Sequence, residues 1–256
     1  MPTVLALCAH PDDAEFRCGG TLLLLAHRGW QVHIATVCAG NCGSAELSPN
    51  ATAVLRRGEA HSAAAVAGGA YHCLDGLDLQ AYDNDEFRGK ATALIRAVQP
   101  DCLITHYPTD YMPDHDAASA IARCAAFTAP MPNYVVGPAA ALPPTAGVVP
   151  LYYFGPLGDA DYFGAPVVAP WFVDVSAVIE EKAEMLGQHV SQREWLRRQH
   201  GMDQYLEEMM HWDRAAGARC GADYAEGFFQ HRGHGYPQTP VLQEALGELV
   251  REGIAS

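Results

Sequence analysis

The sequence has 256 residues, of which 49% are hydrophobic and 18% are charged. A chain of this length and composition buries one sizeable core and needs no second one, so we expect a single α/β domain over residues 1–256. The formal net charge of −14 repels polyanions. This argues against nucleic acid and against an anionic membrane as partners.

The N-terminus has no basic segment ahead of a long apolar stretch, which a secretory signal peptide would have. The apolar run at 21–26 is too short to cross a bilayer. We therefore expect a cytoplasmic protein. Its eight cysteines form no Cys-x-x-Cys pair, and free thiols are the expectation without export.

Strand-like and helix-like segments alternate through the first half of the chain. Apolar runs predict strands at 4–9, 32–38, 71–74 and 102–106. The segments between and after them predict helices at 15–29, 51–67, 86–98 and 115–128. This alternation indicates right-handed βαβ units, and hence an α/β, Rossmann-like, doubly wound and mainly parallel sheet.

The second half is less regular. Strand-like patches occur at 151–154 and 172–175, helices are predicted at 177–189 and 192–214, and the Gly-, His- and aromatic-rich tail at 217–240 is expected to be irregular. We expect residues from about 130 to 240 to contribute a C-terminal cap and elements of the pocket.

A cluster of ionisable residues, His10-Pro11-Asp12-Asp13, directly follows the first predicted strand. Histidine and aspartate are both good zinc ligands, and His10 and Asp13 are close enough in sequence to converge on one ion. Asp12 would then be a carboxylate beside the metal but free of it, as a general base requires. The alternative is an ordinary turn in which Asp12 or Asp13 caps the next helix.

A second cluster follows the strand at 102–106 and includes His106, Asp110, Asp114 and His115. Ligands bind outside the carboxyl ends of strands in such sheets, so the two clusters are expected to meet. His115 would complete a set of three ligands with His10 and Asp13, and Asp114 or Asp110 could orient an imidazole. The alternative for His115 is a solvated residue in the first turn of a helix.

Motifs of other enzyme classes are missing from the sequence. The first strand is not followed by Gly-x-Gly-x-x-Gly, and the chain has no phosphate-binding Gly-x-x-x-x-Gly-Lys-Ser/Thr loop and no Gly-x-Ser-x-Gly elbow. The first turn is acidic instead, which suits a cation better than a phosphate.

Ala9-His10-Pro11-Asp12-Asp13-Ala14-Glu15, together with Pro113-Asp114-His115, resembles the PIG-L/LmbE-like N-acetylglucosamine de-N-acetylase family. Further similarity spans roughly residues 3 to 230 and lies at Arg56, Glu59, Gly69, Lys182, His189, Ser191, Gln192 and Ala225-Glu226-Gly227-Phe228.

The resemblance implies that His10, Asp13 and His115 bind zinc, that Asp12 is the general base and that Asp114 supports a histidine. The family often has a further histidine where this chain has Met112, whose thioether cannot donate a hydrogen bond. His106, Asp110 and His189 are the candidates to replace it. Substrate contacts are expected from Glu15, Arg17, Asp110 and His189.

The function predicted on this basis is removal of an acetyl or other acyl group from the amide nitrogen of an amino-sugar-like small molecule. One alternative is an amidase acting on another acyl amide or on a thiol conjugate, and another is a metal-binding protein without activity. We expect one Zn²⁺ per chain, with Fe²⁺ as an alternative. By resemblance, the protein is expected to form a homo-oligomer, a trimer or hexamer.

Overall fold

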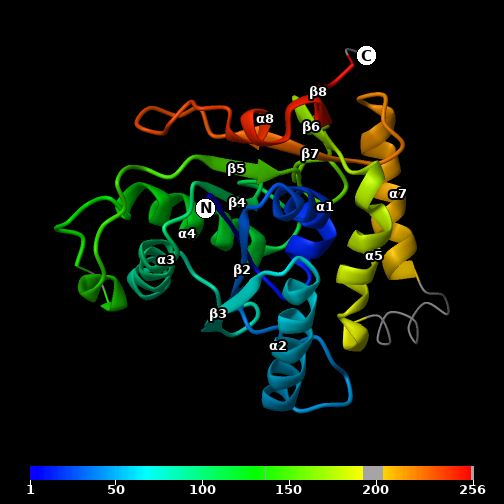
Figure 1. Ribbon diagram of the computed structural model, residues 1–256. Coiled ribbons are helices and arrows are strands. Elements are labelled where there is room, and N and C mark those ends of the chain that lie inside the picture. The colour runs from blue at the N-terminus through cyan, green and yellow to red at the C-terminus, as the bar shows by residue number, and fades with distance from the viewer. Residues whose placement is uncertain (136, 193–203, 255–256) are drawn as a thin grey trace.

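The computed structural model describes residues 1–135, 137–192 and 204–254. The described residues form one eight-stranded sheet with helices packed on both of its faces (Figure 1). The α/β, mainly parallel architecture predicted from the alternating segments is therefore confirmed.

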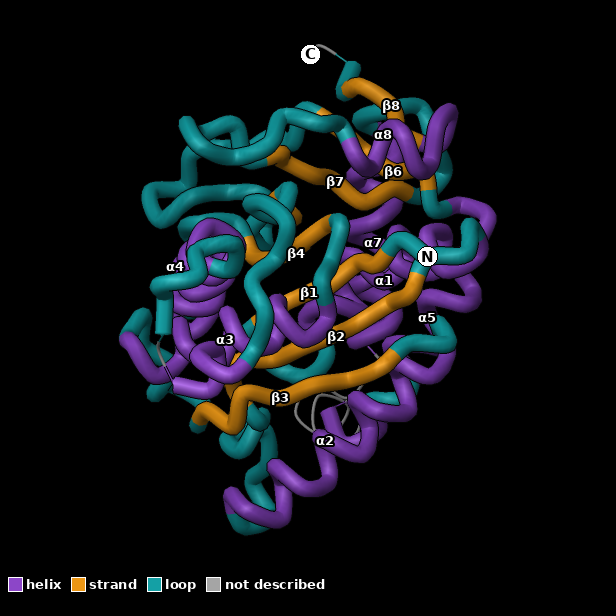
Figure 2. The backbone as a smooth tube through the Cα atoms, turned by 60° about the vertical axis from the view of Figure 1, so that its left-hand side comes forward, coloured by secondary structure: helices purple, strands orange, loops and turns teal. Residues whose placement is uncertain are grey.

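The strands lie side by side in the order β3-β2-β1-β4-β5-β7-β6-β8 (Figure 2). The first five are parallel, and each of the last three pairs antiparallel with its neighbours. In sheet order, the strands are β3 (Ala70–Gly76), β2 (Gln31–Cys38), β1 (Thr3–Cys8), β4 (Cys102–His106), β5 (Leu151–Phe154), β7 (Ala225–Gln230), β6 (Trp171–Asp174) and β8 (Val250–Glu252).

Two hydrophobic layers hold the helices to the sheet. The first contains side chains of α1 (Asp13–His27), α2 (Pro49–Val66), α5 (Ile179–Gly187) and α8 (Val241–Leu246). The layer on the opposite face contains side chains of α3 (Asp85–Val98) and α4 (Pro113–Thr128). Because β1 is covered on both faces, all six of its residues are buried, which explains its continuous apolar sequence.

One further helix and three short 3₁₀ turns complete the elements described beside the sheet and these helices. The helix α7 (Gln204–Ala218) packs on α5 through a small cluster that includes Ile179, Leu186 and Met209. Single 3₁₀ turns occur at Gly137–Ala141, Ser176–Val178 and Gly247–Leu249.

The helices begin in two different ways. Ser48 and Asn84 accept hydrogen bonds from backbone N–H groups in the first turns of α2 and α3, as ordinary N-caps do. The residues that precede α1 and α4, Asp12 and Met112, make no such bond. The acidic side chains at the starts of α1 and α4 are thus available for other contacts.

The tail at 217–240 differs from the prediction. Instead of being irregular throughout, it contains β7, which lies between β5 and β6 with four of its six residues buried. Hydrogen bonds to β5 and β6 stabilise this strand, although the Gly- and His-rich sequence around it favours irregular structure. The helix predicted at 192–214 is observed from Gln204 as α7, and its residues 193–203 lie outside the described part of the chain.

The C-terminal half does more than cover the site, because β5, β6 and β7 extend the sheet itself.

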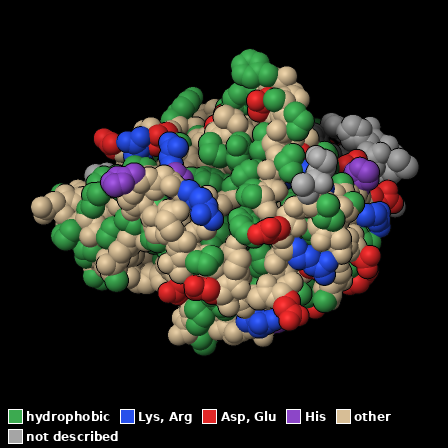
Figure 3. Space-filling model, turned by 90° about the horizontal axis from the view of Figure 1, so that it is seen from above, with side chains coloured by type: hydrophobic (Ala, Val, Ile, Leu, Met, Phe, Trp, Pro, Cys, Tyr) green, Lys and Arg blue, Asp and Glu red, His purple; other side chains and the backbone are tan. Residues whose placement is uncertain are grey.

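On the face seen in Figure 3, Lys and Arg side chains lie among Asp and Glu side chains. No helix in the described part of the chain is both long and apolar enough to cross a membrane.

Candidate metal centre and pocket

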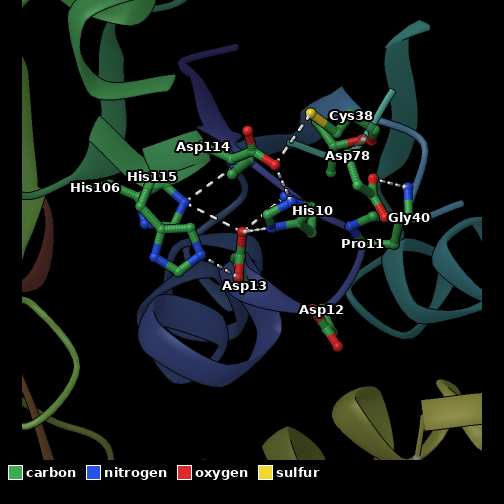
Figure 4. A network of polar contacts seen from close by, with 12 residues as sticks. His10, Pro11, Asp12, Asp13, Cys38, Gly40, Asp78, His106, Asp114 and His115 are labelled. Carbon is green, nitrogen blue, oxygen red and sulfur yellow. Dashed lines mark hydrogen bonds and ion pairs between the residues drawn. The ribbon is translucent and has the colours of Figure 1, made fainter. Parts of the chain in front are cut away.

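The two predicted clusters meet at the carboxyl ends of β1 and β4, where α1 and α4 begin (Figure 4). His10 follows β1, Asp13 opens α1, His106 ends β4, and Asp114 and His115 lie in the first turn of α4. Because β1 and β4 are adjacent parallel strands, residues about one hundred positions apart become neighbours.

His10, Asp13 and His115 offer ligand atoms that all lie within 4.8 Å of one another. His10 Nδ1 is 3.7 Å from Asp13 Oδ2, and His115 Nε2 is 3.5 Å from Asp13 Oδ1. Tetrahedral zinc bonds of roughly 2.0–2.2 Å place neighbouring ligand atoms about 3.3–3.6 Å apart. The spacing of these three residues therefore fits one such cation.

The ring nitrogens that point away from this triplet are hydrogen-bonded to carboxylates. His10 Nε2 lies 2.9 Å from Asp114 Oδ2, and His115 Nδ1 lies 2.8 Å from Asp110 Oδ2. A carboxylate on the outer nitrogen fixes the ring and leaves the other nitrogen free to bind a metal. Asp114 and Asp110 are thus placed as the sequence analysis expected of residues that orient an imidazole.

The charge balance of the centre also suits a cation. Burial raises the pKa of the Asp13 carboxyl, but His115 and His106 outweigh it and hold that pKa well below the ordinary value. Burial lowers the pKa of His10, but Asp114 and Asp13 outweigh it and raise that pKa well above the ordinary value. The carboxylates thus attract positive charge to the position that a metal would occupy.

His106 lies beside the triplet, with its ring 4.1 Å from that of His115 and nearly parallel to it. Its Nε2 accepts a hydrogen bond from the backbone N–H of Ala9 at 3.0 Å and lies 3.2 Å from Asp13 Oδ2. His106 and Asp110 also belong to another group, with His115, that could hold a metal. A third such group joins His10, Cys38 and Asp114.

Asp12 lies apart from this cluster, and no dashed line joins it to the other residues labelled in Figure 4. Its Oδ2 accepts hydrogen bonds from the Tyr205 hydroxyl at 2.6 Å and from Arg56 Nη2 at 3.2 Å. Burial raises the pKa of the Asp12 carboxyl above its ordinary value, against the opposing effect of Arg56. The backbone at Asp12 has a φ of 108°, which is rare for a residue with a side chain.

A pocket of about 440 Å³ opens onto the cluster. Its polar or ionisable side chains come from His10, Asp12, Asp13, Arg17, Cys42, Arg56, Asp78, His106, Asp110, Tyr111, Asp114, His115, Gln192 and Tyr205. Phe16, Gly43, Leu79, Met112 and Leu157 complete its wall.

Of the four residues predicted to contact substrate, two line this pocket. Arg17 is held by the carbonyl oxygen of Gly155, and Asp110 is bound to His115. Glu15 and His189 are buried behind the wall, with His189 Nε2 3.4 Å from Glu15 Oε1. The direct substrate contact predicted for Glu15 and His189 is therefore not what this geometry provides.

Other residues that carried the family resemblance have structural contacts. Lys182 is fully buried between Asp213 of α7 and Glu226 of β7, at 2.6 and 2.7 Å. Glu226 also accepts hydrogen bonds from the backbone of α1 at residues 20 and 21. These contacts join four elements, α1, α5, α7 and β7, behind the site.

Asp78 and Tyr205 are among the pocket residues that were not predicted from the sequence. Asp78 accepts hydrogen bonds from the backbone N–H groups of Gly40 and Cys42 and so shapes the loop after β2. Tyr205 reaches Asp12 from α7, 193 positions away. Neither residue belongs to a recognisable motif, and the packing of distant elements alone brings them to the pocket.

The comparison with protein families agrees with the geometry of the site. A match to the family described as "PIG-L: GlcNAc-PI de-N-acetylase" spans residues 5–126. These residues carry a PIG-L domain. The resemblance predicted from the sequence is thereby confirmed, and the matched segment contains all the residues expected to bind the metal.

Solved structures of similar fold include N,N'-diacetylchitobiose deacetylase from Pyrococcus horikoshii, with a TM-score of 0.75 and 23% identity over 93% of this chain and 88% of that one. A 4-carboxy-2-hydroxymuconate hydratase from Pseudomonas putida has a TM-score of 0.74 and 22% identity over 91% and 98% of the two chains. These two likenesses show the shared fold.

A curated relative is the 4-oxalmesaconate hydratase of Pseudomonas putida, 26% identical over 192 residues, or 70% of each chain. The similar proteins with named activities thus include both deacetylases and hydratases. The shared fold thus occurs in proteins that catalyse more than one kind of reaction.

Proposed function

We propose that this protein is a metal-dependent hydrolase that removes an acetyl or similar acyl group from the amide nitrogen of an amino-sugar-like small molecule. The observation that carries the proposal is the triplet of His10, Asp13 and His115, with a carboxylate on the outer nitrogen of each histidine and Asp12 left outside the triplet. Zn²⁺ fits this donor set, and Fe²⁺ is the alternative.

A cation held there would supply polarisation of the amide oxygen and a lower pKa for water. The chain's own residues would do the rest. Asp12 accepts the proton of the attacking water and returns it to the leaving amine. Asp114 and Asp110 keep the two imidazoles in place.

A hydratase is the second candidate, because the curated relative described above adds water to a different kind of substrate. The charges in the pocket favour the amidase. Five aspartates line it against two arginines, and Arg56 and Arg17 already bind Asp12 and a backbone carbonyl respectively. With a divalent cation bound, these five aspartates and two arginines would carry a net charge of about −1. Such a pocket suits an uncharged sugar better than a polycarboxylate.

The deciding experiment measures acetate release by zinc-loaded protein from a panel of N-acetylated amino sugars and their conjugates, with 4-oxalmesaconate as the test of the hydratase. Asp12→Asn removes the base while keeping the size of the side chain, so we expect turnover to fall by about 10²–10⁴-fold. Zinc content should stay at one per chain, because Asp12 is outside the triplet.

Two results would count against the proposal. Turnover of 4-oxalmesaconate alone would establish the hydratase, and stoichiometric zinc without turnover of any compound would support a metal-binding protein without activity. Assembly into a homo-oligomer and a cytoplasmic location are further proposals, which gel filtration with light scattering and cell fractionation would test.

A further inference from the structure

Tyr205 is the one described residue beyond position 192 that lines the pocket. Its hydroxyl lies 2.6 Å from Asp12 Oδ2, and a carboxylate at this position can only accept, so the tyrosine donates. Tyr205 lies outside the matched domain of residues 5–126. The contact is therefore a feature of this chain's C-terminal half.

The ring of Tyr205 packs against side chains of neighbouring helices. Its centroid lies 5.9 Å from that of Phe16, whose backbone N–H donates to the carbonyl oxygen of Asp12. Tyr205 and Phe16 both belong to the cluster through which α7 packs on α5. Since these neighbours are parts of packed helices, the hydroxyl is directed at Asp12 by the fold and not by a chance surface contact.

Both donors to the Asp12 side chain use the same oxygen. Tyr205 and Arg56 bind Oδ2, while the described residues give Oδ1 no hydrogen bond. The backbone of Asp12 is in the left-handed region, and Arg56 donates a hydrogen bond to the carbonyl oxygen of Pro11, the preceding residue. These two features fix the backbone from which the Asp12 side chain extends. One oxygen is thus held and the other is left available to a water molecule.

We propose that Tyr205 is a positioning residue, which holds Asp12 Oδ2 so that Oδ1 is presented to the attacking water. The proposal rests on the proposed hydrolysis. Tyr205 acts through Asp12 and transfers no proton of its own.

The test compares Tyr205→Phe with Tyr224→Phe, the matched control. The Tyr224 hydroxyl accepts a hydrogen bond from Arg214, a residue of α7. Tyr224 does not line the pocket. We expect Tyr205→Phe to lower kcat by about 10-fold or more, with KM and zinc content within about twofold of the unmodified protein. Tyr224→Phe should leave all three quantities unchanged.

A double-mutant cycle with Asp12→Ala shows whether the two side chains interact. If they do, the denaturation midpoint of Asp12→Ala/Tyr205→Phe shifts by less than the sum of the single shifts. Additive shifts overturn the inference. Unchanged kcat in Tyr205→Phe overturns it as well, and a rise in KM alone shows a substrate contact instead of positioning.

The two proposals fail in distinguishable ways. If the unmodified protein turns over no compound of the panel, the proposed hydrolysis fails and the inference fails with it, whatever the denaturation cycle shows. If the unmodified protein is active and Tyr205→Phe is equally active, the inference alone is wrong.

Discussion

At the scale of single residues, the proposed metal triplet depends on carboxylates outside it, which bind the outer nitrogens of its two histidines. Asp114 Oδ2 contacts His10 Nε2 and also accepts the backbone N–H of Leu79 at 2.7 Å. That second bond fixes the carboxylate, which in turn fixes the imidazole. The orientation of His10 is thus set by three segments of the chain, after β1, after β3 and at the start of α4.

We predict that Asp114→Asn weakens zinc binding by about 10–100-fold, because the amide is a poorer acceptor for the His10 ring. Competition with a chromogenic chelator measures the affinity. Asp83→Asn, which removes an equal charge from a surface pair with Arg88, should leave the affinity unchanged. Equal affinities for Asp114→Asn and the unmodified protein would contradict the role assigned to Asp114.

The residues of the centre could be found from the sequence because they follow apolar strands directly. His10, Asp13 and His115 needed only the rule that parallel strands share an edge, and the structure brings them together. Tyr205 and the burial of Glu15 with His189 could not be found in this way. Both depend on how α5 and α7 pack against α1, which no local pattern encodes.

At the scale of elements, the buried Lys182 joins α5 to α7 and β7. Asp213 and Glu226 place two carboxylates around one ammonium group, and burial raises the pKa of Asp213 to about 6 despite that cation. Removing the ammonium group would leave two buried carboxylates without a positive charge between them. An uncompensated buried charge of this kind strongly lowers the stability of the folded protein.

Lys182→Met should therefore lower the free energy of unfolding by about 3–5 kcal/mol. Urea denaturation followed by circular dichroism measures the loss. The matched control is Arg57→Met, which breaks the exposed pair with Asp75 and should cost less than about 1 kcal/mol. Similar losses for both variants would show that burial of the Lys182 cluster contributes little.

Element boundaries in the first half follow the prediction closely because strands and helices alternate with clear apolar periods. The strand β4 was predicted at its observed bounds, Cys102–His106. By contrast, β7 has a glycine at its centre and a flank rich in histidine, and its identity as a strand comes from β5 and β6 on either side. Such long-range pairing leaves little trace in the local sequence.

At the scale of the whole molecule, the matched domain is only part of a folding unit. Residues 5–126 contain most of β1 and all of β2, β3 and β4, but β4 pairs with β5. Both hydrophobic layers also include side chains from beyond residue 126, such as Tyr152 and Phe228 in one and Tyr153 in the other. The sheet and its core are thus completed by the second half of the chain.

We expect a fragment of residues 1–126 to lack a cooperative unfolding transition, because β4 would be left as an exposed edge and both layers would be open. Thermal denaturation monitored by near-ultraviolet circular dichroism compares the fragment with the full chain. A sharp transition in the fragment would mean that the first half folds alone.

The site is divided between the two halves of the chain in an uneven way. Every residue of the triplet comes from the first 115 positions, whereas Leu157, Gln192 and Tyr205 come from the second half and complete a pocket wall that the first half begins. Substitutions at Leu157 or Gln192 would thus reshape the pocket wall without altering a member of the triplet.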